Sequence, residues 1–384
     1  MKVNNIFAST LAILLAVSLY SCNSTDGQTE SVAPDTVFEI ETVAHTEPET
    51  EPETEPETLP ETEPETEAPV VDDRVINPLT GLESENDYMA RRPVAIMINN
   101  IRIATPQEGI SYADIMYECV VEGQQTRLMM VVSDYENLPV IGSVRSSREY
   151  YLDFAANHNA LYVHAGASNQ AYAEIKARNI DNFDGVHMYI PGMFYRDEWR
   201  RSNMGYEHSL MTDGTRITAA IDRLKYSTEL AEGFDSPLDF VPYDTVRVPE
   251  DGDASCLRVS YSGSHKPYFE YNSNEGVYYR WQFLGDKHMD NTAGVQVSYK
   301  NVIVLYLPTV YTGDKDGHMD VTTTGTGVGY YLTMGKYENI TWEKADEDTP
   351  MKLYNAAGEP LLVNRGKTFF QICSEEMAQT TELR

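Results

Sequence analysis

Positive charge is scarce in this 384-residue sequence: 29 Lys and Arg residues face 60 Asp and Glu residues, and the formal net charge is −31. Because nucleic acids are bound through basic surfaces, this balance argues against a nucleic-acid partner. Hydrolase signatures are missing too, since neither Gly-x-Ser-x-Gly nor His-Glu-x-x-His occurs. The sequence therefore names no reaction, and whether the protein is an enzyme stays open.

Cysteine is also rare, with 4 residues and no Cys-x-x-Cys pair. Three of them, Cys119, Cys256 and Cys373, lie in apolar runs, an arrangement typical of buried free thiols. This odd number, together with eight histidines that lack zinc spacing, argues against a disulfide framework and against a metal site. We therefore expect no metal and no cofactor.

Long hydrophobic runs are missing as well: the run at Ile6–Leu19 is shorter than the roughly 20 apolar residues of a membrane-spanning helix. Residues 1–21 instead fit a secretory signal peptide. Ser21 and Cys22, with the preceding Leu19, resemble the lipobox of bacterial lipoproteins, in which the cysteine is diacylated. We expect an exported protein anchored through Cys22 to the outer face of the cytoplasmic membrane, where two acyl chains hold stably. The alternative is an ordinary signal peptide that is cut elsewhere.

Basic residues are absent from residues 22–73, which hold 17 acidic residues and Glu-Pro-Glu-Thr repeats at 47–67. So little apolar surface cannot offset the entropy of ordering the chain, and we expect a disordered tether. Proline and like charges extend such a chain, so residues 47–69 could span up to about 70 Å. The tether either carries the domain through the inner cell wall or keeps it soluble, and both interpretations stay open.

Residues 74–384 are long enough for two domains. In the first half, strand patterns alternate with helix patterns. The predicted strands are 93–98, 114–122, 127–133 and 161–164, and the predicted helices are 148–157, 170–178 and 216–230. Strands predicted in the second half are 257–261, 277–283, 301–307, 319–323, 329–334, 340–343 and 368–373. We predict an α+β fold, with a mixed α/β domain at 74–240, a β-rich domain at 241–374 and a tail at 375–384.

Several motifs carry a family resemblance. They are Arg92-Pro93-Val94-Ala95, Tyr117-Glu118, Glu122-Gly123, Thr126-Arg127, the run from Gly142 to Arg148, His164-Ala165-Gly166-Ala167-Ser168, and in the second half residues 301–304, 324–330, Trp342 and 366–368. Together they resemble the YerB-like family of bacterial lipoproteins, a pair of adjoining domains of unknown function. The resemblance runs from about residue 77 to residue 374 and implies a Gram-positive-type lipoprotein with a mixed α+β fold. It implies no reaction. Gln124 and Glu207 depart from the glycine and proline usual at their positions.

An anion pocket is predicted at Arg145, Ser146 and Arg148, where a helix is expected to begin. A helix N-terminus attracts anions, and the planar guanidinium binds carboxylate or phosphate through two hydrogen bonds. Alternatively, Ser146 or Ser147 caps the helix and the arginines form ion pairs. The candidate partners for such pairs are Glu118, Glu122 and Asp153.

The segment from His164 to Ser168 predicts a strand that ends in a small-residue loop before a helix, where α/β folds hold ligands. His164 could act as an acid or base there, with His208 as its partner. The backbone of Gly166 to Ser168 could receive an oxyanion. The alternative is that His164 is only a hydrogen-bonded structural residue.

Glu118 and Glu122 lie four residues apart in a predicted strand, so both would face one side. Paired carboxylates serve as acid and base in glycoside cleavage. Their backbones would be about 13 Å apart, which exceeds the usual carboxyl separation. We therefore favour an ion-pair cluster, with Arg127 neutralising one carboxylate.

Three functional hypotheses follow. In the first, which we prefer, a pocket binds an anionic group of an envelope polymer or a small ligand; its residues are Arg127, Arg145, Arg148, His164 and His208. In the second, an enzyme acts on the same material with His164, His208 or the two glutamates as acid and base. In the third, the protein assembles with another envelope protein. The oligomeric state stays open.

Overall fold

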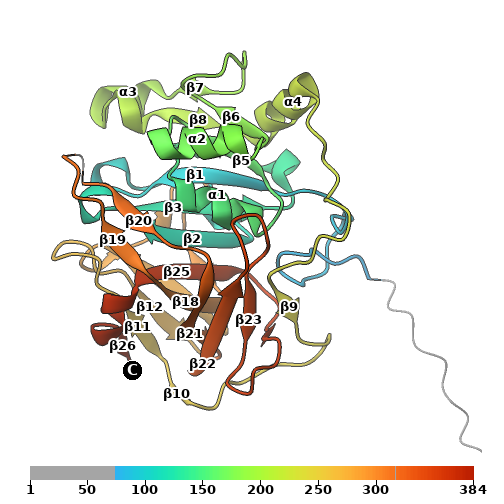
Figure 1. Cartoon of the computed structure of the whole chain (residues 1–384), viewed down its shortest axis with the longest axis vertical. Coiled ribbons are helices and arrows are strands. Elements are labelled where there is room, and N and C mark those ends of the chain that lie inside the picture. The colour runs from blue at the N-terminus through green and yellow to red at the C-terminus, as the bar shows by residue number, and fades with distance from the viewer. Residues whose placement is uncertain (1–73, 316) are drawn as a thin grey trace, which may run out of the picture. The chain divides into compact units, whose positions relative to one another are not determined.

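An 11-stranded sheet runs through both halves of the computed structural model, which describes residues 74–315 and 317–384 (Figure 1). The strand order is β10-β22-β21-β18-β25-β2-β3-β1-β5-β6, and β23 pairs with β22. Strand β25 (Thr368–Ser374) comes from the C-terminal half and lies in parallel between β18 (Asn301–Leu307) and β2 (Ile115–Val120). The predicted division at residue 240 therefore does not separate two sheets, and the described chain from residue 74 belongs to one compact unit. The predicted α+β class is confirmed.

The strands of the N-terminal half are buried along almost their whole length, and most of their side chains are apolar, because the sheet is covered on both faces. They are β1 (Val94–Asn99), β2, β3 (Thr126–Val132), β5 (Leu161–His164) and β6 (Asn182–Asp184). β1 is parallel to β5, and β3 is antiparallel to both β1 and β2. Consequently β1, β2, β5, β6, β18 and β25 all point the same way, and their carboxyl ends meet at one edge of the sheet.

Four α-helices accompany these strands in the described residues. They are α1 (Glu149–Ala156), α2 (Asn169–Ala177), α3 (Glu198–Asn203) and α4 (Gly214–Leu224). The side chains of Ser168, Asp197 and Asp213 cap the last three by accepting backbone N–H groups. The helix predicted at 216–230 is too long, because Lys225 adopts a left-handed conformation and ends α4. Short 3-10 helices complete the connections: η1 (Arg102–Ala104), η2 (Ile110–Tyr112), η3 (Glu122–Gln124), η4 (Tyr135–Asn137), η5 (Tyr206–His208) and η6 (Glu375–Gln379).

A second sheet of six strands, with the order β14-β13-β12-β11-β26 and β17 beside β13, belongs to the C-terminal half. Its strands are β11 (Cys256–Arg258), β12 (Tyr268–Asn272), β13 (Val277–Gln282), β14 (Asp286–Lys287), β17 (Ser298–Tyr299) and β26 (Glu382–Leu383). In β13 the side chains alternate between half-exposed and buried, so Tyr278, Arg280 and Gln282 face inward. Phe269 of β12 packs edge-on against Phe369 of β25, with ring centroids 5.1 Å apart, which joins the two sheets.

The remaining strands lie in the large sheet or in two- and three-stranded sheets. Those of the large sheet are β10 (Gly252–Asp253), β21 (Gly325–Thr333), β22 (Lys336–Lys344) and β23 (Lys352–Tyr354). The others are β4 (Ile141–Gly142), β7 (Tyr195–Arg196), β8 (Leu210–Thr212), β9 (Asp239–Phe240), β15 (Met289–Asp290), β16 (Val295–Gln296), β19 (Thr309–Tyr311), β20 (Met319–Val321) and β24 (Leu362–Val363). The predicted strands at 161–164 and 301–307 coincide with β5 and β18.

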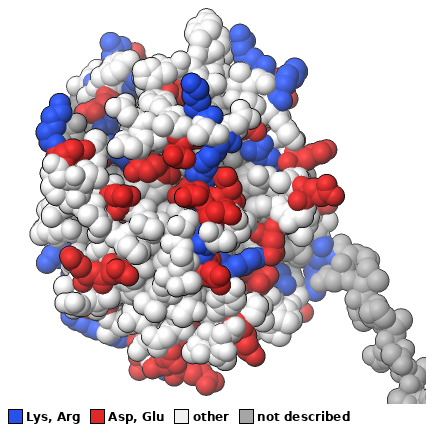
Figure 2. All heavy atoms as spheres, in the orientation of Figure 1, with Lys and Arg blue, Asp and Glu red and all other residues white. Residues whose placement is uncertain are grey.

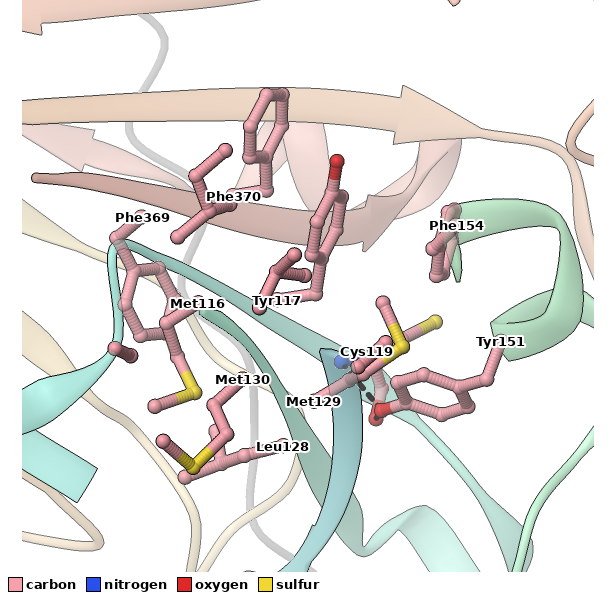
Figure 3. Packing of buried hydrophobic residues seen from close by; sticks show 14 of the residues in the cluster. Met116, Tyr117, Cys119, Leu128, Met129, Met130, Tyr151, Phe154, Phe369 and Phe370 are labelled. Carbon is pink, nitrogen blue, oxygen red and sulfur yellow. Dashed lines mark hydrogen bonds between the residues drawn. The ribbon is translucent and has the colours of Figure 1, made fainter. Parts of the chain in front are cut away.

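Aromatic packing holds α1 against the centre of the large sheet (Figure 3). Tyr117 of β2 stacks on Phe370 of β25 at 4.5 Å and on Phe154 of α1 at 5.2 Å. The hydroxyl of Tyr151 bonds the backbone of Cys119. Burying such rings contributes about 1.5–3 kcal/mol each, so this contact between the two halves is a large part of the core. The free thiols of Cys119 and Cys373 are buried, whereas Cys256 is half-buried.

Candidate functional site

The predicted site residues gather at the carboxyl edge of the large sheet. Glu118 lies in β2 and Glu122 just beyond it, and His164 ends β5. Arg127 is the second residue of the antiparallel strand β3, which lies between β2 and β5 in the sheet. The loop with Arg145 lies against the end of β5, since Ala165 N donates to Arg145 O at 3.0 Å. Carboxyl ends of parallel strands are where open α/β sheets bind ligands. The topology therefore brings together residues that are distant in sequence.

Three arginines and two glutamates form the surface part of this site, and we name Arg127, Arg145, Arg148, Glu122 and Glu207 the arginine cluster. Glu122 bridges two of the arginines, with Oε1 at 2.5 Å from Arg127 Nη2 and Oε2 at 2.6 Å from Arg148 Nη2. Both guanidinium groups are nearly buried and also donate to backbone carbonyls. These three side chains thus make a fixed frame.

The outer part of the arginine cluster is a single exposed ion pair. Arg145 Nη2 lies 2.7 Å from Glu207 Oε2, and the side chains are 21% and 61% exposed, respectively. Exposed pairs of this kind contribute about 0–1 kcal/mol, so little free energy is needed to open this one. Arg145 is therefore held less firmly than Arg127 and Arg148, whose side chains are nearly buried.

The electrostatics of the arginine cluster favour negative charge. Burial and the nearby Arg148 lower the pKa of Arg127 to about 10. Burial by itself would raise the pKa of Glu122, but attraction to Arg127 and Arg148 outweighs it and lowers that pKa. The hydrogen bond from Arg145 lowers the pKa of Glu207. Three cations thus face two ionised carboxylates, which leaves an excess positive charge. On the face drawn in Figure 2, by contrast, acidic side chains gather at the centre and at the lower end.

The local geometry around Ser146 corrects several predictions. Arg148 is the N-cap of α1 and no side chain caps it, so neither Ser146 nor Ser147 does so. The ion-pair alternative holds for Glu122, because it binds two of the arginines. Glu122 does not share a strand with Glu118, however, because β2 ends at Val120.

The segment after β5 also differs from its predicted role. The N–H groups of Gly166 and Ser168 donate to Asp184 Oδ1 at 2.8 Å and to Ser147 O at 3.3 Å, so neither is open to an oxyanion. The hydroxyl of Ser168 accepts from Ala171 N as the N-cap of α2. The ring nitrogens of His164 lie 3.0 Å from Gly166 O and 3.1 Å from Asn182 Oδ1. This geometry supports the structural alternative.

His208 lies on the other side of the site. Its Nδ1 is 2.9 Å from Asn99 Nδ2, and its Nε2 is 3.7 Å from Glu207 Oε1. Burial lowers the pKa of His208, an effect that Glu207 opposes. Among the hydrogen bonds of the described chain, none joins His208 to His164. Each histidine instead has its own partners, Asn99 for His208 and Gly166 and Asn182 for His164.

Beneath the arginine cluster lies a buried polar network centred on Glu118, which has no solvent exposure. Oε2 accepts hydrogen bonds from Arg280 Nη2 at 2.6 Å and from Gln371 Nε2 at 2.9 Å. Oε1 accepts from Asn100 Nδ2 and from the Thr126 hydroxyl and lies 2.9 Å from His265 Nε2. Burial alone would raise the pKa of Glu118, but Arg280 and His265 lower it well below its usual range. Because both carboxylate oxygens of Glu118 are hydrogen-bonded and its pKa is low, the geometry does not support Glu118 as a general acid or base.

The network continues to the surface through a chain of amides and a histidine. Arg280 Nη1 donates to His288 Nδ1 at 2.6 Å, because burial holds the pKa of His288 well below its usual value and keeps the ring neutral. His288 Nε2 is 3.2 Å from Gln107 Oε1, and Gln107 Nε2 donates to the Asn99 carbonyl. The side chain of Asn99 then reaches His208. The buried carboxylate is thus linked to the arginine cluster.

Sequence reasoning missed Arg280, His265 and His288, which the C-terminal half contributes. A signal for Arg280 is present in hindsight: it interrupts the strand pattern of Val277–Gln282 on the same side as Tyr278, where a charge needs a buried partner. Nothing in the sequence identifies that partner as Glu118, which lies 162 residues earlier.

Two families of protein domains match this sequence. Residues 79–227 match the family described as "Protein of unknown function (DUF3048) N-terminal domain". Residues 257–370 match "Protein of unknown function (DUF3048) C-terminal domain". The chain therefore has the paired-domain organisation of the DUF3048 class.

The chain is similar to a protein of Bacillus subtilis (strain 168) that is named "Putative lipoprotein YerB". The two are 27% identical over 278 residues, which cover 70% of this chain and 78% of YerB. The crystal structure of YerB from Bacillus subtilis matches with a TM-score of 0.69 at 24% identity and covers 81% of this chain and 100% of that chain. This chain belongs to the YerB-like family, as its motifs predicted.

Metal-ion clusters and membrane-spanning helices are both absent from the described residues. No group of three or more His, Cys, Asp or Glu side chains in them is arranged to hold a metal ion. Within the same ranges, no helix is long and apolar enough to cross a membrane. Residues 1–21, Cys22 and the tether at 22–73 lie outside the described chain.

The Glu118 network predicts a pH-dependent stability. Because the folded state holds the pKa of Glu118 below that of the unfolded chain, ionised Glu118 stabilises the fold above about pH 4.3, and this contribution falls as the pH drops further. Glu118→Gln should lower the unfolding free energy at pH 7 by about 3–5 kcal/mol, because Arg280 then lacks its counter-charge. Urea denaturation at pH 7, 5 and 3 measures it.

The difference between wild type and Glu118→Gln should shrink between pH 5 and pH 3. A difference that is the same at every pH would show that Glu118 is not held ionised by the fold. Glu207→Gln serves as the control, since its exposed ion pair should change stability by about 1 kcal/mol or less.

Proposed function

We propose that this protein is an exported lipoprotein whose folded part binds an anionic group of an envelope polymer or a small anionic ligand at the arginine cluster. The observation that supports this most is the position of Arg145. It stands beside two buried arginines that share one carboxylate, and only the exposed Glu207 accepts a hydrogen bond from its guanidinium in the described chain. A ligand carboxylate or phosphate would take the place of Glu207.

The chemistry of the arginine cluster suits such a ligand. A guanidinium presents parallel N–H donors that match the oxygens of carboxylate or phosphate, and charge-assisted bonds are stronger than neutral ones. Arg127 and Arg148 would contribute mainly through their charge, because Glu122 and backbone carbonyls already occupy their N–H groups. Glu207 would act as an internal competitor that pairs with Arg145 until a ligand arrives.

Ligand-dependent thermal stabilisation of residues 74–384 tests the binding proposal. The panel consists of phosphate, phosphorylated sugars, nucleotides and cell-wall fragments. A ligand present at one hundred times its dissociation constant should add about 2.7 kcal/mol to the unfolding free energy. Arg145→Gln should abolish the shift, whereas Glu207→Gln should increase affinity because it removes the competing carboxylate.

Loss of the shift in Arg145→Gln would support a ligand at the arginine cluster. A shift that survives Arg145→Gln would place the ligand elsewhere. The absence of any shift across the panel would contradict the proposal and favour a protein partner.

Membrane anchoring rests on Cys22 and on membership of a family that includes a named lipoprotein. Cys22→Ser should move the protein from the membrane fraction to the soluble fraction, because the thiol that carries the acyl chains is gone. Fractionation and immunoblotting of cells measure the change. A Cys22→Ser protein that stays membrane-bound with its signal peptide cleaved would contradict the anchor.

A further inference from the structure

A hollow of ≈ 740 Å³ lies on the outer face of the six-stranded sheet, apart from the residues of the arginine cluster. Tyr279 and Trp281 alternate outward from β13 and line it, opposite in direction to the buried Arg280 between them. Its volume falls within the range of about 300–1,000 Å³ that is usual for small-molecule sites. The anion-binding site proposed above involves neither Tyr279 nor Trp281.

The Trp281 ring, which lines this hollow, contacts side chains of both neighbouring strands. Trp281 lies parallel to Tyr268 of β12, at 5.5 Å and 6°. On β14, the ammonium of Lys287 lies 5.6 Å from the Trp281 ring centroid. Such an exposed cation–π contact contributes only about 0.5–1 kcal/mol, so Lys287 can be displaced by another group at little cost in free energy. The Trp281 ring can therefore contact a ligand at a low cost in free energy.

The polar part consists of carboxylates and amides around the rings. Glu270 is exposed and pairs in register with Tyr279, whose hydroxyl donates to Glu275 Oε2 at 2.6 Å. Asn272 and Gln296 also line the hollow, where Asn272 Nδ2 donates to Glu275 Oε1 at 3.1 Å and Gln296 Nε2 donates to the Arg280 carbonyl at 2.8 Å. Each amide nitrogen has a second N–H donor, and the carboxylates have further acceptor positions, for the hydroxyl groups of a ligand. Two carboxylates against one lysine make the lining net negative, which disfavours an acidic ligand.

We infer that this hollow, lined by Tyr279, Trp281, Glu270 and Glu275, binds an oligosaccharide without acidic groups. A sugar ring has an apolar C–H face and a rim of hydroxyls, and this surface offers aromatic rings surrounded by hydrogen-bonding groups. The site would thus take a neutral or amino sugar, whereas the arginine cluster takes an anion. A polymer that carries both kinds of group could contact both sites.

Isothermal titration of the full chain with tri-N-acetylglucosamine and with cellotriose tests this inference. At least one of the two should bind, and Tyr279→Ala and Trp281→Ala should each weaken it by about tenfold or more. Because Trp281→Ala also removes the contact with Tyr268, Glu275→Gln provides a second, milder variant that should weaken binding. Circular dichroism checks the folding of each variant.

Two controls separate this site from the arginine cluster. Arg145→Gln should leave the affinity for the sugar unchanged, and ~0.5 M salt should have little effect, because the contacts do not depend on ion pairs. Wild type that binds neither sugar would overturn the inference. So would binding that is unaffected by all three substitutions in the hollow.

Discussion

The carboxylate of Glu118 carries a charge that has no access to water, and the rest of the structure is arranged around it. An unpaired ion in a protein interior costs several kcal/mol, so the fold must bring partners to it. Arg280 comes from the six-stranded sheet and Gln371 from β25, while Asn100 and Thr126 come from the N-terminal half. One side chain thus ties together both sheets and both halves of the chain.

This constraint also positions the surface site. The amides that surround Glu118 hold the segment after β1, and Asn99 in turn holds His208 beside Glu207. Arg127 lies near the start of β3, at the same edge of the sheet, and its guanidinium donates to Glu122 and to the carbonyl of Ser146. The arginine cluster is therefore built on a rigid base, and its outer ion pair, Arg145 with Glu207, includes its most exposed side chain. A binding site gains from such preorganisation, because less ordering is required when the ligand arrives.

Local patterns predicted much of the secondary structure and the main members of the arginine cluster. The strands at 161–164 and 301–307 were placed correctly because their apolar runs are continuous and bounded by turns. The inclusion of Glu122 in a strand was wrong, because Gly123 adopts a positive φ and the chain turns there. Two features could not be predicted from the sequence: the insertion of β25 beside β2 and the pairing of Glu118 with Arg280. Both depend on contacts between residues far apart in sequence, which no local period encodes.

A double-mutant cycle on Glu118 and Arg280 tests the central claim most directly. The unfolding free energy would be measured for wild type, Glu118→Gln, Arg280→Met and the double variant at pH 7. The account predicts that each single substitution is strongly destabilising, because it leaves a buried charge unpaired, and that the double variant loses clearly less than the sum of the two. Losses that simply add would contradict the account, since they would show that the two side chains do not stabilise the fold as a pair.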